Sequence, residues 1–242
     1  MITISNLKKQ FGETCACDIP SFTINDGDIL GLVGNNGAGK TTLFRLLLDL
    51  LQADAGSVEY EFATTPDGPS AINPAESEAW KEHVGAYIDE GFLIDFLTPE
   101  EYFSFLGKVS GISQQEVDER LQRFERFAND EIFGKKKLIR DLSAGNKMKV
   151  GIISALFRHP KTVILDEPFN FLDPTSQLVL KHLLKDYAQE TGATILISSH
   201  NLQHTVDISS RIALLEHGVI IRDLPNSEGS ATQELQEYFG AE

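Results

Sequence analysis

Residues 34–41, GNNGAGKT, have the types and the spacing of a loop that binds phosphate groups. They fit the pattern G-x-x-x-x-G-K-[ST], in which glycines let backbone N–H groups turn towards an anion without Cβ clashes. The helix that follows adds free N–H groups and a partial positive charge. In this pattern Lys40 reaches the β- and γ-phosphates of a nucleotide, and the Thr41 hydroxyl ligates Mg²⁺. The residues predicted to contact the nucleotide are Gly34, Asn35, Asn36, Gly37, Ala38, Gly39, Lys40, Thr41 and Thr42.

A second candidate site follows the apolar run TVIL at 162–165, which ends in two carboxylates, Asp166 and Glu167. Because side chains alternate along a strand, the two carboxylates point in different directions and suit two tasks. Asp166 can hold Mg²⁺, and Glu167 can orient the water that attacks the terminal phosphate and accept its proton. An Asp-Glu pair before Pro168 is also a common surface start of a helix, so the assignment depends on the phosphate loop.

The elements that must hold these residues follow from the apolar pattern. The run at 29–33 is typical of a buried parallel strand, and leucines at helical spacing predict a helix over 41–51. Further strands are expected at 84–88, 162–165, 194–198, 211–215 and 219–223, and helices at 175–190 and 231–239. This alternation indicates an α/β fold with a parallel sheet covered on both faces, into which a helical lobe is inserted.

The inserted lobe is expected over about 98–140, a charged and amphipathic stretch within a single domain that spans 1–242. Thr98 or its neighbour is expected to cap a helix that begins at Pro99, and another helix is expected over 114–127. Ser143 is expected to cap the helix that follows the lobe. The clearest loop is TTPDGP at 64–69.

The balance of charge limits the class of partner. The chain has 242 residues, of which 41% are hydrophobic, and a formal net charge of −15. An acidic surface repels phosphate backbones, so we expect no nucleic acid partner and no docking on anionic lipid by charge alone. Cys15 and Cys17 are expected to be reduced thiols. No targeting segment is visible, nor an apolar run of the roughly 20 residues that a membrane helix needs, so we expect a cytoplasmic protein unless a partner holds it at a membrane.

Beyond these motifs, the sequence resembles an ABC nucleotide-binding domain over nearly its whole length. The distinguishing element is LSAGN at 142–146, which resembles the family signature LSGGQ and has the family's spacing before the second carboxylate motif. Residues 171–174 resemble the D-loop, His200 resembles the switch histidine, and Phe11 stands where the family has an aromatic residue that stacks on adenine. Taken alone, His200 would more often be structural, and Phe11, one of 15 Phe residues, could instead have a core or surface role.

The resemblance implies a P-loop NTPase core with a parallel sheet, an antiparallel β subdomain and an inserted helical lobe. It also implies ATP and Mg²⁺ as cofactors and a head-to-tail dimer, either a homodimer or a heterodimer of ABC ATPase chains. Each ATP would lie between the phosphate loop of one chain and the signature of the other. Hydrolysis, with Glu167, His200 and Lys40 as catalytic groups, would drive transport through separate membrane-spanning permease subunits, which would hold this chain at the inner face of the cell membrane. The residues expected to act across the dimer are Ser143, Ala144, Gly145, Asn146 and Asp173.

Three positions depart from the family pattern. Ala144 replaces a signature glycine, Asn146 replaces its glutamine, and Asp89 stands where the Q-loop has a glutamine that contacts magnesium. An aspartate can ligate Mg²⁺ but cannot donate a hydrogen bond to water as an amide does, so Asp89 is a further candidate ligand. Two alternatives to a transporter motor stay open: a soluble ABC ATPase that acts on protein complexes, and an ATP-sensing dimerisation module with little turnover.

The segment GFLIDFL at 91–97 is unusually apolar for a loop in so acidic a chain. We expect a groove here that receives a short helix of the permease, with Phe92 and Phe96 among its lining residues. The alternative is that these side chains pack the helical lobe onto the core.

Overall fold

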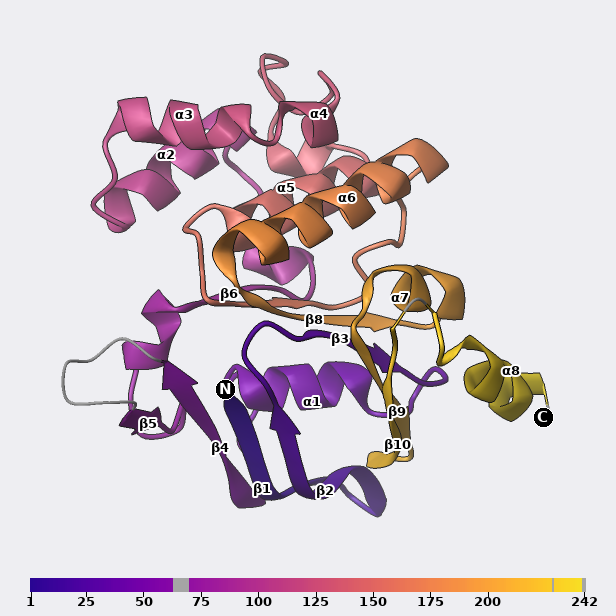
Figure 1. Cartoon of the computed structure of the whole chain (residues 1–242). Coiled ribbons are helices and arrows are strands. Elements are labelled where there is room, and N and C mark those ends of the chain that lie inside the picture. Colours follow the sequence, from indigo (N-terminus) through magenta and orange to yellow (C-terminus); the bar gives the residue numbers. More distant parts are fainter. Residues whose placement is uncertain (63–69, 228, 241–242) are drawn as a thin grey trace.

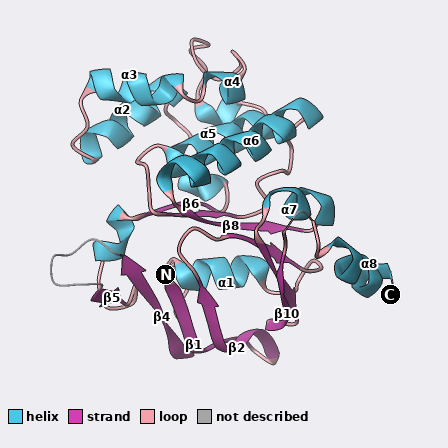
Figure 2. Ribbon diagram, viewed as in Figure 1, coloured by secondary structure: helices cyan, strands magenta, loops and turns pink. Residues whose placement is uncertain are grey.

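The computed structural model describes residues 1–62, 70–227 and 229–240, so the loop predicted at 64–69 lies outside the described residues. Strands form a lower and a middle layer, and most helices lie above the middle layer (Figure 2). In the described ranges, none of the helices combines the length and the apolar character needed to cross a membrane.

The lower layer is a four-stranded antiparallel sheet in the order β2-β1-β4-β5. One face of this sheet is buried, as Ile2, Ile4 and Leu7 of β1 show. Burial on one face is typical of an antiparallel sheet that covers a core. The layer matches the predicted antiparallel β subdomain. Its strands are β1 (Ile2–Phe11), β2 (Thr14–Ile24), β4 (Ala55–Phe62) and β5 (Ser70–Ile72).

The middle layer is a six-stranded sheet in the order β10-β9-β3-β8-β7-β6. Its strands pair in parallel except β10, which runs antiparallel to β9 at the edge. β7 and β8 are buried at every position, as expected of strands covered on both faces. The predicted sheet is thus confirmed. Its strands are β3 (Ile29–Val33), β6 (Val84–Tyr87), β7 (Thr162–Leu165), β8 (Thr194–Ser199), β9 (Arg211–Glu216) and β10 (Val219–Pro225).

Helices cover both faces of the middle sheet (Figure 1). α1 (Lys40–Leu47) lies between the two sheets, where Leu43, Phe44 and Leu47 fill one core. α5 (Ala144–Leu156) and α6 (Pro174–Thr191) lie on the opposite face and build a second core with β7 and β8. Because the strands are parallel, the segments that follow β3, β7 and β8 meet at one edge of the sheet.

The stretch assigned to the lobe forms α2 (Pro99–Val109), α3 (Gln114–Gln122) and α4 (Glu125–Ala128), which lie above α5 in Figure 1. Thr98 caps α2 as predicted, because its hydroxyl accepts from the Glu101 N–H at 3.3 Å while the Glu101 carboxylate accepts from the Thr98 N–H at 2.8 Å. The single helix predicted over 114–127 is wrong. The chain breaks between α3 and α4, where Phe124 and Phe127 both enter the buried core.

Two further elements differ from the prediction. The helix expected over 41–51 ends at Leu47, since Asp49 adopts a φ of 51° that a continuing helix cannot contain. A short helix, α7 (Leu202–Ile208), follows β8 and was not expected; Asn201 caps it by accepting from the Gln203 N–H at 3.0 Å. The last described helix is α8 (Thr232–Gly240).

Candidate functional site

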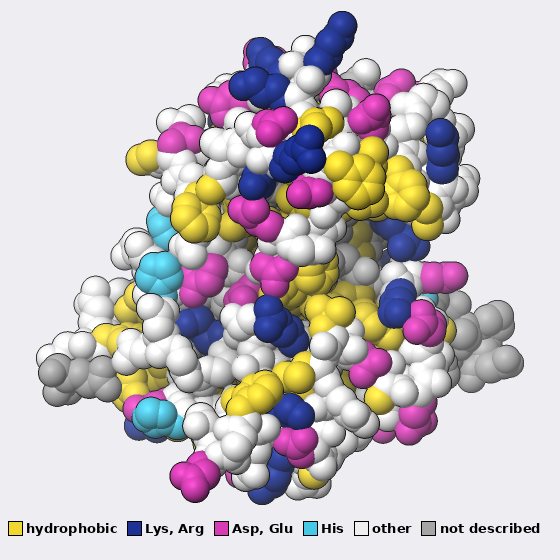
Figure 3. All heavy atoms as spheres, turned by 180° about the vertical axis from the view of Figure 1, so that it is seen from behind, with side chains coloured by type: hydrophobic (Ala, Val, Ile, Leu, Met, Phe, Trp, Pro, Cys, Tyr) yellow, Lys and Arg dark blue, Asp and Glu magenta, His cyan; other side chains and the backbone are white. Residues whose placement is uncertain are grey.

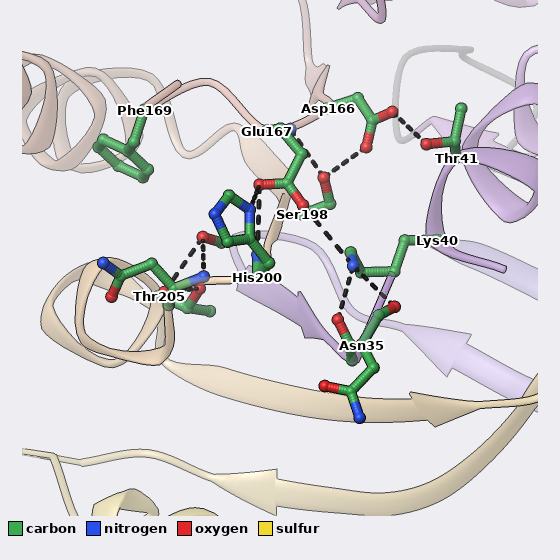
Figure 4. Close-up of polar contacts among 12 residues, drawn as sticks. Asn35, Lys40, Thr41, Asp166, Glu167, Phe169, Ser198, His200 and Thr205 are labelled. Carbon is green, nitrogen blue, oxygen red and sulfur yellow. Dashed lines mark hydrogen bonds and ion pairs between the residues drawn. The ribbon is translucent and has the colours of Figure 1, made fainter. Parts of the chain in front are cut away.

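The phosphate loop joins β3 to α1, and Lys40 is the first residue of the helix. Lys40 is only 6% exposed. Its Nζ donates to the carbonyl oxygen of Gly34 at 2.6 Å and to that of Asn35 at 3.4 Å (Figure 4). The ammonium group is therefore held against the loop at the start of α1, which is the position that the motif requires for a phosphate ligand.

Two glycines of the loop are required by close backbone contacts. Gly39 has a φ of 106°, and a Cβ there would lie 2.4 Å from the carbonyl oxygen of Ala16. A Cβ on Gly34 would lie 2.3 Å from the carbonyl oxygen of Leu215. Neither position accepts a larger residue without a backbone shift, so β2 and β9 fix the curvature of the loop.

The first carboxylate after β7 lies against the start of α1. Thr41 Oγ1 donates to Oδ2 of Asp166 at 2.5 Å, and Ser198 of β8 donates to Oδ1 (Figure 4). Asp166 is 7% exposed, and this burial raises its pKa although the two hydroxyl groups oppose the shift. The charge of Asp166 is thus compensated mainly by neutral hydroxyl groups, and a cation at this place would be stabilised.

The pair of Thr41 and Asp166 fits a magnesium ion. A hydroxyl and a carboxylate oxygen in contact are the hard ligands that Mg²⁺ prefers, and Mg²⁺ commonly binds one or two such groups together with phosphate and water. Among the residues that the structure describes, no cluster of three or more His, Cys, Asp or Glu side chains could hold a metal. The residues present therefore fit an ion that takes its other ligands from phosphate oxygens and water.

The second carboxylate, Glu167, points away from Asp166, as predicted (Figure 4), but it lies beyond the end of β7 with a φ of 47°, so a backbone turn sets its direction and not the alternation of a strand. Its Oε1 lies 3.6 Å from Nζ of Lys40, and its Oε2 lies 2.8 Å from Nδ1 of His200. Oε2 also accepts from the backbone N–H of His200 at 3.2 Å, and the Glu167 N–H donates to Ser198 Oγ at 2.7 Å. The structure thus brings Lys40, Glu167 and His200 together from three different strand ends.

The signature segment begins α5. Ser143 caps this helix by accepting from the Asn146 N–H at 3.2 Å, and Ala144 is its first residue. Ala144 is exposed and helical, so its replacement of glycine requires no positive φ. Gly145 lies against the D-loop, because a Cβ there would be 2.6 Å from the carbonyl oxygen of Phe171. Within the chain, α5 and α1 lie on opposite faces of the sheet (Figure 1).

The D-loop aspartate has a structural contact of its own. Asp173 caps α6, since its carboxylate accepts from the N–H groups of Thr175 at 2.9 Å and Ser176 at 3.0 Å. Hydrogen bonds from the Ser176 hydroxyl and backbone hold the pKa of Asp173 below its usual range. Its predicted role across a dimer stays a prediction.

Two weaker candidates lie further out. Phe11 ends β1 and is 52% exposed, with Nζ of Lys9 5.6 Å from its ring centroid, so an aromatic face is available to a ligand. Asp89 accepts from Nη2 of Arg45 at 3.0 Å and from the Gly91 N–H at 2.9 Å. Each of its carboxylate oxygens therefore has a partner within the chain, while the side chain is 50% exposed.

Sequence reasoning missed three side chains that surround this site. Ser198 forms hydrogen bonds with the Asp166 carboxylate and with the Glu167 backbone. The sequence could have indicated it, because Ser198 is a polar residue near the carboxyl end of the apolar strand TILISS. Arg45 and Lys147 pair with the carboxylates of Asp89 and Glu90. The sequence contains no signal for these two pairs, because their members are far apart along the chain.

Comparison with known proteins shows the family to which the chain belongs. The family model described as ABC transporter matches residues 17–170. Methionine import ATP-binding protein MetN of Rhizobium johnstonii is 31% identical, over 92% of this chain and 60% of its own length. Bacitracin transport ATP-binding protein BcrA of Enterococcus faecalis is 33% identical, over 94% of this chain and 70% of its own.

Solved structures give the same fold. The dimeric structure of MJ0796, described as a bacterial ABC transporter cassette, matches with a TM-score of 0.80 at 22% identity, over 94% of this chain and 99% of that one. A structure described as the ATP binding subunit of an ABC transporter also matches with a TM-score of 0.80, at 23% identity and over 99% of this chain and 93% of that one. The chain therefore belongs to the ABC transporter family, and it is an ATP-binding ATPase domain of that family.

Proposed function

We propose that this chain is the Mg-ATP-hydrolysing motor subunit of a membrane transporter and that it works as a head-to-tail dimer. The observation that carries the proposal is the double contact of Glu167, with Lys40 at 3.6 Å and with His200 at 2.8 Å. A phosphate-binding lysine, a carboxylate and a histidine at one sheet edge are the groups that hydrolysis of a terminal phosphate needs.

The residues divide the reaction between them. Lys40 and the backbone N–H groups at the start of α1 bind the β- and γ-phosphates through charge-assisted hydrogen bonds. When a phosphate group binds Lys40, it replaces the ion pair between Lys40 and Glu167. The Glu167 carboxylate is then free to orient a water molecule and to accept a proton from that water. His200 keeps that carboxylate directed at the water. Thr41 and Asp166 would hold Mg²⁺, which would neutralise the negative charge of the phosphate groups.

The head-to-tail dimer is supported by where the signature lies. The phosphate loop precedes α1 and the signature begins α5, and these helices cover opposite faces of the sheet. Ser143 and Ala144 are exposed at the start of α5. In our proposal this helix start, with its free N–H groups, meets the γ-phosphate bound by a second chain.

The proposed transporter partner docks in an apolar groove of about 230 Å³ that is lined by the residues just after α1, by β6 and by neighbouring residues up to Phe92. Figure 3 shows hydrophobic side chains gathered in the hollow between the core and the helical part. Of the residues predicted for this contact, Phe92 lines the groove, Leu93 is buried in the core, and Phe96 is 64% exposed. Leu50, which was not predicted, lines the groove and is 55% exposed. The groove residues are Leu48, Asp49, Leu50, Trp80, Lys81, Val84, Ala86 and Phe92.

Steady-state ATP turnover and chromatography of Glu167→Gln test the proposal. The substitution keeps the shape of the side chain but removes the base, so turnover should fall while ATP persists and holds two chains together. We expect a dimer with Mg-ATP and mainly monomer without nucleotide. A variant that stays monomeric at saturating Mg-ATP would contradict the dimeric site. An unmodified chain that dimerises but does not hydrolyse ATP would instead support the ATP-sensing module.

A further inference from the structure

Two neighbouring carboxylates, Asp89 and Glu90, connect the phosphate-loop helix to the signature helix. Oδ2 of Asp89 lies 3.0 Å from Nη2 of Arg45 on α1. Oε2 of Glu90 lies 2.9 Å from Nζ of Lys147 in the first turn of α5. Asp89 caps a short 3-10 turn (Glu90–Phe92). The two carboxylates therefore extend from the same turn, one towards α1 and the other towards α5.

This turn stands beside the nucleotide site. It follows β6, and the carbonyl oxygen of Tyr87 at the end of β6 accepts from the Asp166 N–H at 3.0 Å. Asp166 in turn contacts Thr41 at the start of α1. Asp89 and Glu90 therefore lie only a few residues along the chain from Tyr87, whose backbone contacts Asp166 at the nucleotide-binding edge of the sheet.

The signature helix has close contacts in both halves: Gly145 in its first turn lies against the carbonyl oxygen of Phe171, and its second half packs on β6. A Cβ on Gly151 in its second half would lie 2.2 Å from the ring of Tyr87, and one on Gly85 would lie 1.9 Å from the carbonyl oxygen of Ala155. These close contacts fix the second half of α5 on β6. The first turn has exposed residues at Ser143 and Ala144, and Lys147 is the side chain of this turn that reaches Glu90.

We propose that the pair of Glu90 and Lys147 positions the signature segment for the partner chain, and that Asp89 and Arg45 tie the same turn to the phosphate-loop helix. The inference rests on the proposed function, because the signature has its task in the ATP-bound dimer. Exposed ion pairs contribute little to folding stability, and in this pair the side chain of Glu90 is 59% exposed and that of Lys147 is 19% exposed. The pair can set the orientation of the first turn, and the Tm of each variant reports any contribution that it makes to folding. Lys147 and Glu90 are positioning residues and do not bind the nucleotide.

The test is a charge-reversal cycle in the full chain, with Lys147→Glu, Glu90→Lys and the double variant. Each single reversal puts like charges together, so dimer formation with Mg-ATP, measured in the Glu167→Gln background, should weaken about tenfold. Turnover, measured with Glu167 intact, should fall by a similar factor. The dissociation constant of the monomer for ATP and the Tm should stay unchanged. The double variant should restore dimer formation and turnover, because it rebuilds the pair with the charges exchanged.

A matched control separates the pair from the effect of net charge. Glu234 of α8 lies 3.3 Å from Arg222 of β10 and is 52% exposed, so Glu234→Lys makes the same change of net charge as Glu90→Lys, but away from α5. This control should leave dimer formation and turnover at the level of the unmodified chain. The inference would be overturned if the single reversals had no effect, or if the double variant dimerised as weakly as the single variants. It would also be overturned if Glu234→Lys lost as much dimer formation as the single reversals do. An unmodified chain without turnover and without an ATP-dependent dimer would overturn the proposed function itself.

Discussion

Glu167 and His200 follow neighbouring strands of the sheet, and Nδ1 of His200 lies 2.8 Å from Oε2 of Glu167. The backbone of Glu167 adopts a φ of 47°, which is uncommon for a residue with a Cβ. Its N–H is held by Ser198 Oγ at 2.7 Å, so the carboxylate is turned towards His200 and Lys40 rather than towards Asp166. Strain of this kind is typical of functional sites.

His200→Ala should lower turnover while nucleotide binding is kept. His200 is 53% exposed at its side chain, so its removal leaves the core intact, but the Glu167 carboxylate loses the partner that directs it. We expect the turnover rate to fall about a hundredfold or more. Steady-state ATP hydrolysis and equilibrium binding of a fluorescent ATP analogue measure the two effects separately. Equal losses of binding and turnover would place His200 in nucleotide binding instead.

Lys40→Ala should weaken nucleotide binding. The substitution removes the charge that reaches the β- and γ-phosphates and leaves the backbone of the loop in place. We expect ATP affinity or turnover to fall by at least about tenfold, which is about 1.4 kcal/mol. Titration calorimetry with ATP checks the affinity. Unchanged affinity together with unchanged turnover would show that the assignment of the phosphate loop is wrong.

Asp166→Asn should stabilise the nucleotide-free protein. Burial raises the pKa of Asp166, so the stability that its protonated form contributes is complete at low pH and is lost as the pH rises through the raised pKa. At neutral pH the ionised carboxylate opposes folding, and an amide removes that charge while it can still bond Thr41 and Ser198. In a domain of this size the Tm should rise by roughly 2–4 °C for each kcal/mol relieved.

The same variant should lose the rise in Tm that Mg-ATP gives to the unmodified chain, because a candidate magnesium ligand is gone. Differential scanning fluorimetry with and without Mg-ATP measures both effects. A lower Tm for nucleotide-free Asp166→Asn would contradict the stabilisation. An unchanged Mg-ATP shift would argue against Asp166 as a ligand.

The Mg²⁺ dependence of turnover tests the candidate ligand Asp89. Asp89→Gln replaces a carboxylate with a neutral amide, so we expect the half-saturating Mg²⁺ concentration to rise while ATP affinity stays within about tenfold. Arg45→Met should have the opposite effect on the Mg²⁺ requirement, because it frees the Oδ2 atom that Arg45 now occupies. Identical metal titrations for the three proteins would show that Asp89 is not a ligand.

Leu50→Ser should weaken binding of a membrane partner without affecting the ATPase site. Leu50 lines the apolar groove and is 55% exposed, so the change leaves the core intact. Leu178→Ser on α6 is the matched control, because Leu178 is 54% exposed and is not among the groove residues. A search of the neighbouring genes for a polytopic membrane protein, followed by co-expression and co-purification, measures the contact. Equal recovery with Leu50→Ser and Leu178→Ser would contradict the groove, and no recovery with the unmodified chain would favour the soluble ATPase.

The sequence by itself determined the local features. The glycines of GNNGAGKT, the caps at Thr98 and Ser143 and the apolar strands depend on neighbours within a few residues, so their patterns are readable along the chain. The expectation that Asp166 and Glu167 face different partners was confirmed for another reason than strand alternation, because both residues lie beyond β7 and Glu167 has a φ of 47°. The same local logic failed at the helix predicted over 114–127. The structure ends α3 at Gln122 and begins α4 at Glu125, although Val117, Phe124 and Phe127 keep a helical spacing and are all buried, so the periodic pattern carries no sign of the break.

Only the tertiary structure decided which distant side chains meet. Thr41 and Asp166 are 125 positions apart, and they touch because parallel strands place their carboxyl ends at one edge of the sheet. Ser198 reaches Asp166 for the same reason. The pair of Glu90 and Lys147 depends on the packing of α5 against β6. Such contacts have no periodic signal, because they arise from the order and the pairing of strands rather than from neighbours along the chain.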